Sequence, residues 1–188
     1  MTTNALTVTD SLTKTTQRSS LDELVTARTK RSLLLVDVSG SMDHRTSEGL
    51  RKIDQLRNVV RDLLETHPVP VAAFSDSVRL VGDHIPEPSG STRLDSAISF
   101  GRRQEANHLV VVTDGEPDSK TAALEEARLF GGAIDVFYIG DPGSRGAEFC
   151  AQLAKATGGS CGITDLTGEP KKLAAGIAGL LGAASEVL

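Results

Sequence analysis

From Arg31 onward, short runs of aliphatic residues alternate with longer segments of helical periodicity. The runs Leu33 to Val36 and Leu109 to Val112 are apolar without interruption, which is typical of strands buried on both faces of a parallel sheet. Strands joined by helices pair in parallel and carry helices on both faces. The sequence therefore predicts an α/β fold with a doubly wound, mostly parallel central sheet.

Residue periodicity also gives the expected bounds of the elements. The ranges expected to be helices are 47–66, 94–105, 119–130, 144–156 and 170–187, with a short helix at 21–25. The ranges expected to be strands are 33–36, 69–74, 78–81, 109–113, 133–139 and 161–163. The segment 78–81 is short, and we expect it to be an antiparallel strand at the edge of the sheet.

The first residues differ in composition from the rest, because Thr and Ser dominate residues 1–20. This composition fits a solvated tail, while the alternation from Ala5 to Thr9 also fits an added edge strand or a docking arm. The whole chain has 188 residues and a mass of 19.8 kDa, near the common size of one domain. We therefore expect an N-terminal arm at 1–20 and a single domain at 21–188.

Composition narrows the possible partners. The formal net charge is -5, and the pI of about 5.4 is acidic, which argues against binding to a phosphate backbone. Aromatic residues make up only 3% of the chain and Trp is absent, so few side chains could stack on bases. Nucleic acid is not expected as a partner.

The cysteines and the hydropathy pattern indicate in which cellular compartment the protein is expected. Cys150 and Cys161 form no Cys-x-x-Cys motif, and we expect them to be buried in a helix and a strand instead of forming a disulfide. No apolar run reaches the roughly 20 residues of a membrane span, and residues 1–20 lack the apolar segment of a secretory signal. We expect a cytoplasmic protein with no membrane partner.

Polar residues with oxygen ligands follow the first buried strand. Asp37, Ser39 and Ser41 lie on a turn in which Gly40 permits tight bending, so one carboxylate and two hydroxyls can face a common point. Two later segments add oxygens: Thr92 lies in a Gly-containing loop, and Asp114 follows the strand 109–113. Because ligands bind outside the carboxyl ends of parallel strands, we expect these side chains to converge and bind a small divalent cation.

The order Asp-x-Ser-x-Ser, loop Thr and Thr-Asp-Gly resembles the von Willebrand factor A (VWA) family and its metal-ion-dependent adhesion site (MIDAS). The resemblance extends over about residues 31–182 and implies a Rossmann-like fold. It also implies that Mg²⁺ or Mn²⁺ is held by five residues, which are Asp37, Ser39, Ser41, Thr92 and Asp114. In that family the hydroxyls contact the metal directly, and the carboxylates do so directly or through water.

The same resemblance implies a function without catalysis. A Glu or Asp of another protein would complete the metal coordination, making this chain a protein-protein interaction module. A small member of this kind would act as a subunit or adaptor of a larger assembly, such as one containing a MoxR-type AAA+ ATPase. Alternatives are a structural assembly protein whose metal only stabilises the fold, and a metal-dependent hydrolase.

The residues themselves argue against the hydrolase. Ser39 stands where a phosphatase of the haloacid-dehalogenase type would place its second Asp, and the Gly-x-Ser-x-Gly elbow and the phosphate-loop motif are both absent. Asp76 is expected in a turn, Asp118 at a rim or a helix N-cap, and His108 is given no role. The helix from 170 either shifts, as in the resembling family, or simply closes the sheet.

Overall fold

The computed structural model describes residues 30–46, 48–164 and 170–182. The chain divides into two units between residues 30 and 31, and the helices and strands described lie in the second, 31–188. The expectations for an arm at 1–20, a strand at 5–9 and a helix at 21–25 lie outside the described residues, as does the end of the 170–187 helix. The division into arm and domain therefore stays a prediction.

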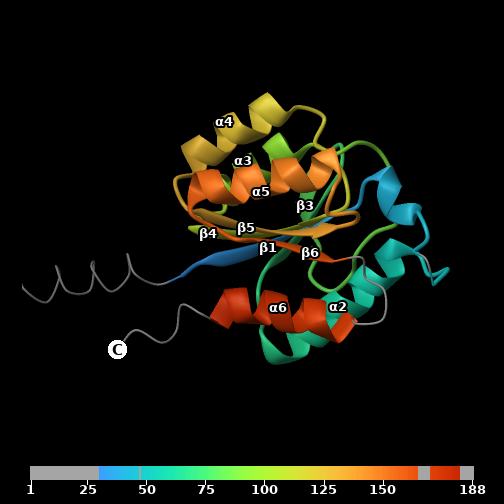
Figure 1. Ribbon diagram of the computed structural model, residues 1–188. Coiled ribbons are helices and arrows are strands. Elements are labelled where there is room, and N and C mark those ends of the chain that lie inside the picture. The colour runs from blue at the N-terminus through green and yellow to red at the C-terminus, as the bar shows by residue number, and fades with distance from the viewer. Residues whose placement is uncertain (1–29, 47, 165–169, 183–188) are drawn as a thin grey trace, which may run out of the picture. The chain divides into compact units, whose positions relative to one another are not determined.

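A six-stranded sheet forms the middle of this unit (Figure 1). Its strands are β1 (Ser32–Asp37), β2 (Val71–Phe74), β3 (Val78–Leu80), β4 (His108–Thr113), β5 (Ala133–Ile139) and β6 (Cys161–Thr164). The spatial order is β3-β2-β1-β4-β5-β6, and every pair is parallel except the antiparallel pair β2 and β3. The expected doubly wound, mostly parallel α/β fold with an antiparallel edge strand is confirmed.

Helices cover both faces of the sheet. They are η1, a 3-10 helix (Gly40–Asp43), α2 (Lys52–Thr66), α3 (Leu94–Arg103), α4 (Lys120–Phe130), α5 (Arg145–Thr157) and α6 (Pro170–Gly182). Figure 1 shows α3, α4 and α5 on one face and α2 with α6 on the other. Leu33 and Leu35 belong to the core under the first group, whereas Leu34 and Val36 belong to the core under the second. This double burial explains the uninterrupted apolar run of β1.

Two element bounds differ from expectation for local reasons. Helix α2 begins at Lys52 and not near 47, because Thr46 N donates to Leu50 O and Arg45 forms a bridge with Arg51 in the preceding turn. Leu50, which lies in the range 47–66 expected to be helical, precedes the helix and is 53% exposed. Strand β2 begins at Val71 because Pro70 has no N–H to donate, although its carbonyl still accepts from Leu34 N.

Both cysteines are free thiols and lie in α5 and β6, as expected. Cys150 is buried, but Cys161, which was also expected to be buried, is half-buried. Burial raises the pKa of the Cys150 thiol to about 12, so it stays protonated at neutral pH. Among the described residues, no helix has the length and apolar character needed to cross a membrane.

Candidate functional site

The predicted oxygen ligands gather at the carboxyl ends of β1 and β4, which are neighbours at the centre of the sheet. Asp37 is the last residue of β1 and Asp114 follows the last residue of β4. The hydroxyl of Thr113 donates to Asp37 Oδ2 at 2.5 Å, which ties the two strand ends together. Sequence reasoning did not assign this role to Thr113.

Asp37 is fully buried and accepts a second hydrogen bond, from the backbone N–H of Ser39 to Oδ1 at 2.7 Å. Burial raises the pKa of this carboxyl to about 6, although the hydrogen bonds from Thr113 and Ser39 act in the opposite direction. The nearby charge of Asp114 raises the pKa further. The ionised form of Asp37 is therefore held where negative charge is disfavoured, and a cation beside it would relieve that cost.

Of the two predicted serines, Ser39 immediately precedes η1 and Ser41 lies within it. Ser39 Oγ and Ser41 Oγ are 3.1 Å apart, and Ser41 Oγ donates to Asp114 Oδ1 at 2.6 Å. Backbone bonds fix this turn to the loop that carries Thr92, since Gly40 N donates to Gly90 O at 3.1 Å. Hydroxyls from both parts of the sequence are thereby held at the same edge of the sheet.

Thr92 completes the predicted set and is buried. A Cβ built on Gly115 would lie 3.4 Å from Thr92 Oγ1 and 3.6 Å from Ser41 Oγ, so both hydroxyls face the space that the missing side chain leaves open. The backbone N–H of Thr92 donates to Asp118 Oδ1 at 3.1 Å. Asp118 thus holds the Thr92 loop, while the N-cap of α4 is Ser119, whose hydroxyl accepts from Ala122 N.

Asp76 secures the same loop from the other side, in agreement with its expected role in a turn. Its Oδ1 accepts from Ser91 N at 3.0 Å and from Ser91 Oγ at 2.6 Å. Gly90, next to this contact, has a φ of 77°, a left-handed conformation that favours glycine. A Cβ at Gly90 would lie 2.2 Å from Asp76 Oδ2, so only glycine leaves this carboxylate in place.

We expect Gly90→Ala to destabilise the protein more than Gly82→Ala does. Both glycines have positive φ, but a Cβ at Gly82 would have no heavy atom within 4 Å. The control substitution should cost about 1 kcal/mol from the backbone conformation alone, whereas the first also displaces Asp76 from Ser91. Urea unfolding of the two variants checks this, and equal losses would contradict the role given to Asp76.

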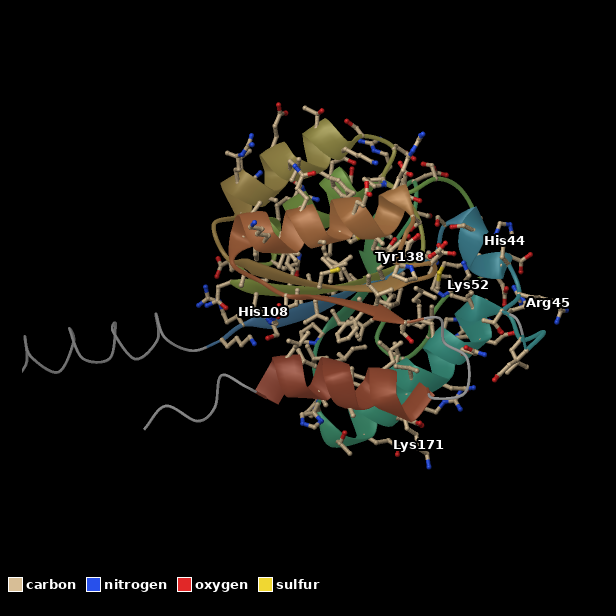
Figure 2. The ribbon with its side chains drawn as sticks, viewed as in Figure 1. His44, Arg45, Lys52, His108, Tyr138 and Lys171 are labelled. Carbon is tan, nitrogen blue, oxygen red and sulfur yellow. The ribbon has the colours of Figure 1, made fainter. Side chains whose placement is uncertain are left out.

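Lys52, the first residue of α2, is the member of the site that sequence reasoning missed. Its Nζ lies 2.5 Å from Asp114 Oδ2, and the side chain of Asp114 is 0% exposed while that of Lys52 is 19% exposed. Figure 2 labels Lys52 at the carboxyl edge of the sheet. A lysine at a helix start ordinarily extends into water, so nothing in the sequence pattern distinguished this one.

The donor set is one of hard oxygens. The predicted ligands comprise two carboxylates, Asp37 and Asp114, and otherwise hydroxyls. Within the described ranges no group of three or more His, Cys, Asp and Glu residues could hold a metal ion. Mg²⁺ is commonly bound through one or two carboxylates with water completing the octahedron, and zinc sites use Cys and His. The residues present therefore fit a small hard cation.

A second polar cluster lies at the opposite end of the sheet, where Figure 2 labels His108. His108 is buried, with Nδ1 2.9 Å from Ser32 Oγ and Nε2 2.7 Å from Asp135 Oδ2. Asp135 Oδ1 also accepts from Ser160 N at 2.6 Å. These contacts link β1, β4, β5 and the residue before β6, which is a structural role that sequence reasoning did not assign.

No family model and no curated protein matches the chain. Among solved structures, the Ro (RSR) protein of Deinococcus radiodurans matches 81% of this chain with 17% identity and a TM-score of 0.44, and the match covers 35% of that protein. A LuxR-family two-component response regulator of Aurantimonas sp. SI85-9A1 matches 82% of this chain and is itself covered to 87%, with 20% identity and a TM-score of 0.43. The response regulator domain of Thermotoga maritima CheB matches 85% and is covered to 99%, with 11% identity and a TM-score of 0.46. Likenesses of this strength say nothing about the activity of this chain.

The expected membership of the VWA family is corrected here: no family model matches the chain, and the solved structures similar to it include response regulators. The predicted function, an adaptor that binds its partner through a MIDAS, depended on that family assignment and is withdrawn together with it. The physical reason is that any doubly wound sheet gathers polar loops at the carboxyl ends of its strands, so Asp, Ser and Thr motifs there locate a site without fixing a family. The expected acidic partner and AAA+ ATPase stay predictions that no contact in the described residues supports.

Proposed function

We propose that the oxygen cluster at the ends of β1 and β4 binds one Mg²⁺ or Mn²⁺ ion, and that the protein is a cation-responsive domain without catalytic activity. Asp37, Ser39, Ser41, Thr92 and Asp114 would hold the ion. The observation that carries the proposal is the convergence of the fully buried Asp37 carboxylate with the linked hydroxyls of Ser39 and Ser41 and the carboxylate of Asp114 at the ends of two neighbouring strands. A bound cation would supply the positive charge that favours the ionised form of Asp37.

The exposure of the two carboxylates supports a role in binding and not in catalysis. Asp37 is 0% exposed, and so is the side chain of Asp114. A general acid or base must come within hydrogen-bond distance of the substrate proton that it transfers. Carboxylates enclosed by Thr113, Ser41 and Lys52 can contact a small ion more readily than an organic substrate.

Calorimetric titration with Mg²⁺ at neutral pH tests the proposal. Asp37→Asn and Thr92→Val each remove one ligand oxygen with little change of shape, and we expect each to weaken binding by at least about tenfold, or about 1.4 kcal/mol. Asp62→Asn and Thr66→Val, at exposed positions of α2, are the matched controls and should bind as the unaltered protein does. Unchanged affinity in both site variants would rule out the assignment.

A second candidate function is phosphoryl transfer to the protein, with the Asp114 carboxylate as the acceptor. The contact of Lys52 Nζ with Asp114 Oδ2 favours it, because an adjacent ammonium would neutralise charge on a transferred phosphoryl group. Asp114 would attack phosphorus and release the leaving group of the donor. The complete burial of the Asp114 side chain opposes this chemistry. Incubation with acetyl phosphate and Mg²⁺ followed by intact-mass measurement decides, since an unmodified mass would exclude the candidate.

A further inference from the structure

We infer that the ammonium group of Lys52 is a built-in competitor for the cation, and that cation binding releases this side chain to solvent. The inference rests on the proposed function and concerns the regulation of that same site. Its basis is the placement of a positive charge 2.5 Å from one of the two carboxylates that would hold the ion.

Both oxygens of Asp114 are already in use. Oδ1 accepts the hydroxyl proton of Ser41 at 2.6 Å, and Oδ2 accepts from Lys52 Nζ. The Ser41 hydroxyl can keep donating to Asp114 while an ion binds, because its oxygen still has two lone pairs for other contacts. An ion that draws on Asp114 must, however, displace the ammonium group from the neighbouring oxygen, because a divalent ion and an ammonium repel each other strongly in a partly buried space.

The surroundings allow Lys52 to leave without unwinding α2. Its backbone N–H donates to His44 O at 3.1 Å. The preceding residue, Arg51, is fixed by Asp43 at 2.7 Å and by Glu87 at 2.6 Å. The start of the helix is thus held independently of the lysine side chain, which is already 19% exposed and has a route to water.

Two cation-dependent states follow from this arrangement. Without the ion, Lys52 neutralises Asp114 and the surface beside η1 carries no free ammonium from this residue. With the ion, the ammonium extends into solvent at the start of α2, so occupancy of a buried site changes the charge pattern of the surface above it. The competitor also sets a threshold, because the ion must displace a tethered charge before it binds.

The test compares Mg²⁺ affinity in the full chain with that of Lys52→Met, which keeps the length of the side chain and removes its charge. We expect Lys52→Met to bind Mg²⁺ about tenfold more tightly, since the ion no longer displaces a charge. Lys120→Met is the matched control, because Lys120 pairs with Glu116 at 2.9 Å outside the predicted ligand set. Its affinity should not change.

Unchanged or weaker Mg²⁺ affinity in Lys52→Met, with loss of binding in Asp37→Asn, would overturn the inference and leave the proposed function standing. Absence of Mg²⁺ binding in both the unaltered protein and Lys52→Met would overturn both. Binding that appears only in Lys52→Met would support the inference in its strongest form.

A second measurement on the unaltered protein guards against misfolding of the variant. Acetylation of Lys52 by an N-hydroxysuccinimide ester, followed by mass spectrometry, should become several times faster when Mg²⁺ is added. The rate at Lys120 serves as the internal reference. Equal rates at Lys52 with Mg²⁺ and with a chelator would overturn the release of the side chain.

Discussion

Replacing Asp37 by Asn is expected to stabilise the metal-free protein at neutral pH and to abolish any stabilisation by Mg²⁺. The Asn side chain can still accept from Ser39 N and can donate to the Thr113 hydroxyl, so the hydrogen bonds to Asp37 are retained in form. What disappears is a buried negative charge. The rise of the Asp37 pKa from 3.8 to about 6 corresponds to about 3 kcal/mol, at about 1.4 kcal/mol per pKa unit.

The pH dependence of this effect has a definite sign. Because the folded-state pKa of Asp37 is raised, its protonated form contributes stability below the unfolded value of 3.8, and that contribution is lost as the pH rises through about 6. The unaltered protein and Asp37→Asn should therefore have similar stability at the acid end and diverge across this window. Above it, the difference should be constant.

Urea unfolding in the presence of a chelator, at a series of pH values, measures this difference directly. Comparison with the unaltered protein removes the opposing effect of Asp76, Asp95 and Glu87, whose pKa values are lowered by hydrogen bonds to Ser91, Arg93 and Arg51. Asp62→Asn serves as the exposed control. A loss of stability in Asp37→Asn at neutral pH would show that its negative charge is compensated within the protein itself.

Asp135→Ala is expected to cost about 3 to 5 kcal/mol, because it leaves the buried His108 Nε2 and the backbone N–H of Ser160 without their shared partner, at about 1 to 3 kcal/mol each. Asp135 is 7% exposed and contacts both His108 Nε2, at 2.7 Å, and Ser160 N, at 2.6 Å. The substitution removes both contacts from the first half of β5. Ser32→Ala, which removes only the hydroxyl beside Nδ1, should cost about 1 kcal/mol.

Chemical denaturation of these variants, with the exposed Glu125→Ala on α4 as control, provides the test. A loss below about 1 kcal/mol for Asp135→Ala would mean that the cluster around His108 contributes no more than a single neutral hydrogen bond. Additive losses in the double variant Ser32→Ala with Asp135→Ala would mean that the two contacts of His108 are independent.

The fold was predictable because its determinants are local. Uninterrupted apolar runs marked β1 and β4, and helical periodicity marked α4 and α5 within a residue or two. The start of α2 was not predictable, because the bridge between Arg45 and Arg51 and the turn closed by Thr46 compete with helix formation up to Leu50. Periodicity does not register such contacts.

The candidate site was predictable only in part. Asp37, Ser39, Ser41, Thr92 and Asp114 were expected together because strand ends in a parallel sheet meet at one edge. Lys52 and His108 were missed because their partners are set by the direction of a helix and by strand register, neither of which the sequence displays. The family assignment failed because many unrelated proteins place polar loops at this edge of the sheet. The same general property of the fold allowed the position of the candidate site to be predicted.

The position of the site in the sheet implies that its two sides open at different rates. Asp37 and Asp114 extend from β1 and β4, each of which is paired on both sides, so backbone opening there is expected to require the unfolding of the whole unit. Ser41, on the short helix η1, and Thr92, on a loop, lie instead between strands, where isolated backbone hydrogen bonds such as Gly40 N to Gly90 O connect the two segments. A bound ion would thus contact strand residues that stay in place as long as the protein is folded. It would also contact residues between the strands, whose segments open and reclose many times in that interval. The residence time of the ion would be governed by the segments that carry Ser41 and Thr92. These segments, and not the carboxylates, would set how quickly the bound ion exchanges.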